Sequence, residues 1–151
     1  MDAQPWKLKN LKKLAFYTTF KDENTTSDYL YQLRHYDERQ HFVEFKISNH
    51  KIKIEQGRYQ IDHLPREHRL CPLFNSNQVE DEIHFFFQCN KYSVKRQAFI
   101  NQINGIIPDF DKKSSPESIK LIMNSNEHYV KKLVMKFIFS CMKIRDPLLV
   151  M

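Results

Sequence analysis

The sequence predicts a small, mainly α-helical domain, and two observations carry this prediction. The chain has only 2 glycines among its 151 residues, whereas β-barrels and tight hairpins use glycine freely at their turns. Apolar residues also recur at helical spacing, most clearly in the stripe of Val130, Leu133, Val134, Phe137, Ile138 and Cys141. A chain of this length can bury roughly 70% of its unfolded surface. It therefore needs no disulfide or metal in order to fold.

The elements are expected as helices separated by polar breaks. They cover residues 5–20, 27–45, a short stretch from 81, 92–104, 115–123 and 126–144. Ser115 is expected to cap its helix, with Pro116 at the first helical position. Residues 45–59 alternate isoleucine with lysine as a strand would, but their flanks favour a helix that ends at Gly57, a suitable C′ position. The one β element expected is a short hairpin near residues 68–80.

The chain divides into N-terminal helices (1–44), a central segment (45–104) and a C-terminal helical region (105–151), which together are expected to form one compact domain. The formal net charge of +6 and the pI of about 9.2 suit contact with nucleic acid or another anionic surface, although many ordinary proteins are equally basic. Three cysteines without a disulfide-framework pattern predict a reducing compartment. No signal peptide or membrane span is evident. We therefore expect an intracellular protein, nuclear or cytoplasmic and not secreted, without a membrane partner.

Residues 71–89 have the spacing of a zinc site from which one ligand is missing. Structural zinc takes four cysteine or histidine ligands. Cys71 opens a turn of the C-x-x-C kind, but Phe74 stands where the second cysteine belongs, and His84 with Cys89 forms an H-x4-C pair ten residues later. The layout is C-x2-[C]-x9-H-x4-C. Because free cysteines are often small core residues, the spacing alone is a weak signal.

The residues around this pattern are similar to those of a known family. The matching blocks are FKISNH (45–50), IEQGRY (54–59), LPRE (64–67), RLCPL (69–73) and VEDEIHF (79–85), with Cys89 and Tyr92. They resemble the zinc-binding segment downstream of the reverse transcriptase in non-LTR (LINE-like) retrotransposons of animals. The match covers roughly residues 42–96, about a third of the chain, and the FIFSC block (137–141) resembles the C-terminal region of that family more loosely.

The resemblance implies a CCHC-type zinc module that helps a retroelement polyprotein to hold RNA or target DNA. Cys71, His84 and Cys89 match its ligand positions, whereas Phe74 offers no lone pair to a metal. Two alternatives follow. Zinc is bound by three protein ligands, with water, His63 or His68 completing the site, or the two cysteines are free thiols in an enlarged aromatic core.

No catalytic function is expected of this chain. The sequence has no paired aspartates of the polymerase kind, no phosphate-binding loop, no dinucleotide fingerprint and no nucleophile elbow. The run Glu80–Glu82 is interpreted as the acidic start of a helix.

Nucleic-acid binding is expected from the basic residues near the zinc-like segment. The candidate phosphate contacts are Lys51, Lys53, Arg58, Arg66, Arg69, Lys91, Lys95 and Arg96, and the candidates for base stacking are Tyr59 and Tyr92. The competing hypothesis is a structural or protein-interaction module. Its partner would meet surplus apolar residues on the last helix, namely Phe137, Ile138, Phe139 and Met142.

Overall fold

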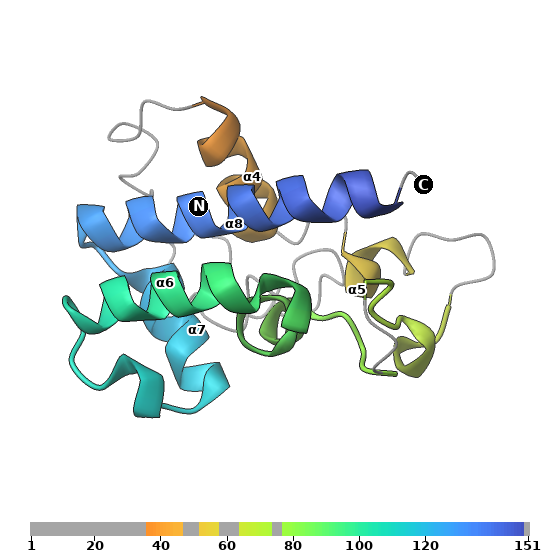
Figure 1. Cartoon of the computed structure of the whole chain (residues 1–151), viewed down its shortest axis with the longest axis horizontal. Helices are drawn as coiled ribbons and strands as arrows, with labels where there is room; N and C mark the ends of the chain where they lie inside the picture. The colour runs from red at the N-terminus through yellow and green to blue at the C-terminus, as the bar shows by residue number, and fades with distance from the viewer. Residues whose placement is uncertain (1–35, 47–51, 58–63, 74–76, 150–151) are drawn as a thin grey trace, which may run out of the picture.

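A computed structural model describes residues 36–46, 52–57, 64–73 and 77–149. These residues form a mainly helical domain, as the sequence predicts (Figure 1). The α-helices are α4 (Tyr36–Lys46), α5 (Lys53–Gln56), α6 (Ser93–Asn104), α7 (Ser115–Asn124) and α8 (His128–Leu149). Shorter helical turns are η2 (Arg66–His68), η3 (His84–Gln88), η4 (Asn90–Tyr92) and η5 (Phe110–Lys112). The predicted helix over 5–20 and the first part (27–35) of that over 27–45 lie outside the described residues, and α4 covers the rest of the second helix.

Helix α8 is the central element of the fold. Helix α4 packs against it, α6 runs alongside it in the opposite direction, and α7 also contacts it (Figure 1). The stripe predicted from the sequence is the buried face of α8, with Val130, Val134, Ile138 and Cys141 fully inaccessible to solvent. The helix extends five residues beyond the predicted end at Ile144.

Aromatic rings fill the junction of α4, η3, α6 and α8. The ring of Phe137 on α8 stacks on that of Phe99 in α6, with the ring centroids 4.8 Å apart, and on that of Phe86 in η3, with the centroids 5.5 Å apart. Phe45 of α4 lies 5.0 Å from Phe85. Such ring pairs stabilise the fold by more than the burial of their apolar area, because each pair adds about 0.5–1.5 kcal/mol to that contribution. These contacts join segments that are far apart in the sequence.

The packing of this core covers the apolar residues of α8 that the protein-interaction hypothesis expected to be exposed. Phe137, Ile138 and Met142 are buried, and the half-buried Phe139 packs edge-on against His41 of α4 at 5.4 Å. The described residues of α8 therefore do not form the exposed apolar patch that was expected of these four, and a protein partner stays a prediction. Helix α8 is covered by elements on several sides, so a wide apolar face has neighbours within the fold.

Two predicted helix ends differ from the structure. Ser114 rather than Ser115 occupies the N-cap position of α7, without a side-chain capping hydrogen bond, and Pro116 is the second helical residue instead of the first. The expected helix through residue 57 is not continuous, because α4 ends at Lys46 and α5 is a single turn. Gly57 closes α5 with a right-handed φ of −62°. The position requires glycine because a Cβ would lie only 2.6 Å from Cγ of Arg69, and not because the backbone is left-handed.

Candidate metal centre

Residues 69–73 and 77–80, here called the hairpin, pair in antiparallel orientation and position Cys71. A single antiparallel bridge joins Leu70 to Val79. It is flanked by hydrogen bonds from the Cys71 amide to the Gln78 carbonyl (2.8 Å) and from the Glu80 amide to the Arg69 carbonyl (2.9 Å). Among the described residues, the short hairpin predicted near residues 68–80 consists of this single antiparallel bridge. It directs the Cys71 side chain toward η3.

The π-helical turn η3 brings His84 and Cys89 together. In an α-helix, residues five apart point about 140° away from each other. Here the Cys89 amide donates instead to the His84 carbonyl (2.8 Å), the i→i+5 bond of a π-turn. Asp81 fixes the start of the turn, because its Oδ1 accepts from the His84 amide at 2.8 Å. The wider turn places residues five apart on the same side.

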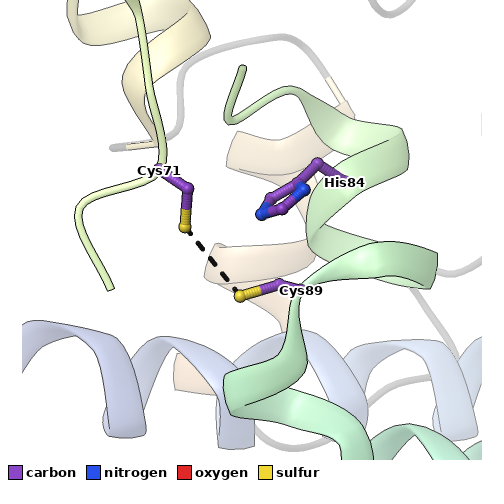
Figure 2. A group of neighbouring side chains, drawn as sticks. All are labelled: Cys71, His84 and Cys89. Atoms are coloured by element: carbon purple, nitrogen blue, oxygen red, sulfur yellow. Dashed lines mark hydrogen bonds between the residues drawn. The ribbon is translucent and has the colours of Figure 1, made fainter. Parts of the chain in front are cut away.

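Cys71, His84 and Cys89 form a buried group that could hold a metal ion, here called the Cys-His-Cys cluster (Figure 2). Their ligand atoms all lie within 4.8 Å of one another. The two Sγ atoms are 3.9 Å apart. Two thiolates on one tetrahedral zinc, each at about 2.3 Å, would lie about 3.8 Å apart. The cluster therefore already has close to the sulfur spacing that zinc requires.

His84 supplies the test of whether a metal fits. Its side chain is 2% exposed, and neither ring nitrogen has a hydrogen-bond partner among the described residues. A buried polar group without a partner costs about 1–3 kcal/mol. A metal bound by one imidazole nitrogen would remove part of that cost, and thiolate and imidazole are the donors zinc prefers. The donor set fits zinc.

The two thiols share a proton in a way that favours metal binding. Hydrogen bonding from the Cys71 thiol lowers the pKa of Cys89 to about 7, although burial opposes the shift. The same contact, assisted by burial, raises the pKa of Cys71 above its usual range. One thiolate is thus populated near neutral pH. Above about pH 7, a cation at the cluster would have to displace only the remaining proton from Cys71.

Two arginines predicted to contact phosphate instead support the loops around the cluster. Arg96 donates to the carbonyls of Phe86 (2.8 Å) and Cys89 (2.7 Å), the end of the π-turn. Arg69 donates to the carbonyls of Leu64 and Ile54, both at 2.8 Å. Burial lowers the pKa of Arg96 from its ordinary value. Both guanidinium groups are therefore held by backbone carbonyls of the fold, and a contact of either with phosphate stays a prediction.

Tyr92 does not serve the predicted stacking role in this structure. It is 1% exposed and its ring packs 5.1 Å from Phe85 in the core. Burial raises the pKa of its hydroxyl. The ring cannot lie on a nucleic-acid base without leaving the core, so the sequence interpretation of this residue is wrong.

The remaining predicted contacts have mixed environments. Arg66 is exposed and pairs with Asp81 at 3.0 Å. Lys91 and Lys95 are exposed, and Lys53 is half-buried. His68 is exposed and lies outside the cluster, so it does not replace the missing ligand in this conformation. Lys51, Arg58, Tyr59, His63 and Phe74 lie outside the described residues.

Glu80 and Arg145 are the pair that sequence reasoning missed. Glu80 is buried against Arg145 near the end of α8, with the closest N–O distance 2.7 Å, whereas the sequence suggested only a helix-start charge. Asp81 takes that role through its bond to the His84 amide. No local pattern signals the pairing, because the two residues are 65 positions apart.

The chain matches no protein-family model, no curated protein and no solved structure. The resemblance to the retrotransposon segment therefore stays a prediction. Within the described ranges, no helix has the combined length and apolar character needed to cross a membrane.

Proposed function

We propose that this protein is a non-catalytic helical module that binds zinc through the Cys-His-Cys cluster and contacts nucleic acid through its basic surface. The observation that carries the proposal is the convergence of two thiols and an unpaired imidazole from separate loops. Three buried side chains with donor atoms within 4.8 Å of one another form a set that a metal ion would fit.

Zinc at this cluster would act as a structural cross-link. It would join the hairpin that carries Cys71 to the π-turn that carries His84 and Cys89. The three side chains are at most 7% exposed, so a substrate would have no access to the ion while the fold is closed. Phenylalanine at position 74 supplies no ligand, which leaves the fourth position to water or to His63, a residue outside the described ranges. This arrangement supports stabilisation rather than catalysis.

Nucleic-acid contact is supported by charge and by the resemblance of the flanking blocks. The net charge is +6, and Lys91 and Lys95 follow the cluster with exposed side chains. Lysines of this kind bind phosphate largely without regard to sequence, and each contact releases counterions. We therefore expect phosphate-dominated binding to RNA or DNA.

The two parts of the proposal are tested separately. Metal analysis of protein purified without added zinc is expected to give about one zinc per chain, and a result well below that stoichiometry would refute the metal centre. Titration with labelled RNA and DNA at several salt concentrations is expected to give log affinity that falls linearly with log salt. Absence of any salt-sensitive complex would refute the nucleic-acid function.

A further inference from the structure

A basic groove runs between α6 and α8, along the side of the central helix. Its volume is about 230 Å³. Lys95 and Gln102 of α6 border it on one side, and Tyr129, Lys132 and Lys136 of α8 border it on the other. No aspartate or glutamate is among the described residues that line it. The groove thus concentrates positive charge in a concave surface.

The three lysines of the groove carry charge that the fold does not neutralise. None of them forms an ion pair within the part of the chain that the structure describes. Lys132 and Lys136 are one helical turn apart, a spacing at which like charges repel by a few tenths of a kcal/mol. An anion in the groove would relieve that repulsion and pair with Lys95 from the opposite helix.

Tyr129 adds an aromatic surface at one end of the groove. Its side chain is 59% exposed, and its position three residues before Lys132 places it on the same face of α8. The apolar floor, Phe99, Leu133 and Phe137, is at most 9% exposed. Tyr129 is therefore the ring in this groove that a ligand can reach.

We propose that the groove between α6 and α8 binds single-stranded nucleic acid, with Lys95, Lys132 and Lys136 on phosphates and Tyr129 stacked on a base. The inference rests on the proposed nucleic-acid function. It keeps Lys95 from the contacts predicted by the sequence and adds Lys132, Lys136 and Tyr129 of α8, which the sequence analysis did not propose. A single strand fits because its bases are free to stack on an aromatic ring, whereas those of a duplex are already stacked. An exposed ring beside a row of cations is the pairing of features that such sites use.

A second cavity in the same molecule provides a contrast. It lies between α4 and α8, holds about 150 Å³, and is lined by Glu44 and Asp146 with no lysine among the described residues. The two cavities that border α8 therefore differ in the sign of the charged side chains that line them. Charge complementarity to phosphate therefore distinguishes the groove between α6 and α8 from the cavity between α4 and α8.

The experiment compares two variants of the full chain that lose the same charge. The groove variant is Lys95→Gln, Lys132→Gln, Lys136→Gln, and its matched control is Lys112→Gln, Lys113→Gln, Lys143→Gln. Binding is followed by fluorescence anisotropy with labelled single-stranded RNA and DNA of about 12 nucleotides, and with the corresponding duplexes, over a range of salt. The groove variant is expected to bind about tenfold or more weakly and to lose about 2 from the log–log salt slope, since each single-strand phosphate contact contributes about 0.7. The control is expected to change affinity by less than about threefold.

Tyr129 is tested by Tyr129→Ala and Tyr129→Phe. The alanine variant is expected to bind single strands about tenfold more weakly with an unchanged salt slope, and the phenylalanine variant to restore binding because it keeps the ring. Tyr129 is 59% exposed, and the ion pairs of the control residues Lys112 and Lys113 lie at the surface, where each contributes at most about 1 kcal/mol. Thermal unfolding of every variant is therefore expected to stay close to that of the wild type.

The outcomes separate this inference from the proposed function. If the wild type binds neither RNA nor DNA, both fail. If the wild type binds and the two triple variants lose affinity equally, the function stands and the groove assignment is wrong. Binding to anionic phospholipid vesicles alone, abolished in the groove variant, would assign the groove to a membrane surface and overturn the inference.

Discussion

Arg145 of α8 holds the buried carboxylate of Glu80 through two hydrogen bonds, of 2.7 and 3.2 Å. Both side chains are 1% exposed. Glu80 Oε1 also accepts from the Lys53 amide at 2.6 Å. One carboxylate therefore ties α8, the hairpin that carries Cys71, and the first turn of α5 together. Burying a charged pair is costly unless its hydrogen bonds are satisfied, and here both carboxylate oxygens have partners.

Removing one member of this pair should destabilise the protein strongly. Arg145→Met leaves a buried, unpaired carboxylate and is expected to cost about 3–5 kcal/mol in the free energy of unfolding. The double variant with Glu80→Gln removes both charges and is expected to recover part of that loss. Urea unfolding of the single and double variants measures both effects. A cost below about 1 kcal/mol for Arg145→Met would show that the pair does not support the fold as described.

Zinc should stabilise the protein only through the Cys-His-Cys cluster. At a zinc concentration about 100-fold above the Kd, binding adds about 2.7 kcal/mol to the free energy of unfolding. Cys71→Ser and His84→Leu are expected to abolish this increase. Cys141→Ala is the control, because Cys141 is also a buried cysteine but lies outside the cluster. Thermal unfolding with zinc and with a chelator gives the comparison. Equal zinc responses in Cys71→Ser and Cys141→Ala would rule out the proposed centre.

Phe74→Cys is expected to tighten zinc binding by restoring the fourth ligand of the C-x-x-C turn. A thiolate in place of water adds a charged donor to the same tetrahedral ion. Competition with a chromophoric chelator compares the Kd for zinc of this variant with that of the wild type and of Phe74→Ser, which lacks a thiol. If the cysteine variant binds no better than the serine variant, position 74 is not a lost ligand position.

The pH dependence of zinc affinity should change near pH 7. Zinc binds thiolates, so protons compete with it wherever the free protein holds them. Below the pKa of Cys89, about 7, both thiols carry protons, and affinity falls steeply as the pH is lowered. Above that pH only Cys71, whose pKa is raised, has a proton to lose, and the dependence of zinc affinity on pH becomes shallower.

Calorimetry in buffers of different ionisation enthalpy should count about one more cysteine proton released at pH 6 than at pH 8. A constant proton count would contradict the shared-proton arrangement.

The sequence predicted the elements whose cause is local. The 3.6-residue period of residues 130–141 identified the buried face of α8, and the C-x2-[C]-x9-H-x4-C spacing identified the three cluster residues. It did not predict which charged residues are buried. Arg69 and Arg96 look like surface cations in the sequence, but each is bound to carbonyls of loops that only the fold brings near. The Tyr92 error has the same origin, since an aromatic residue beside basic ones has the same pattern whether it faces solvent or core.

The two glycines of the chain should respond oppositely to alanine. A Cβ at Gly57 would lie 2.6 Å from Cγ and 2.8 Å from Cδ of Arg69, whose guanidinium is held by two carbonyls. Gly57→Ala is therefore expected to destabilise the protein by about 1–3 kcal/mol.

Gly105 ends α6 with a helical φ of −70°, and a Cβ added there would have its nearest neighbour at 3.4 Å. Gly105→Ala is expected to be neutral or to stabilise by up to about 1 kcal/mol, because alanine loses less backbone entropy on folding. Since both glycines have right-handed φ values, equal effects of the two substitutions in urea unfolding would show that backbone entropy, and not the space taken by Arg69, decides the outcome at residue 57.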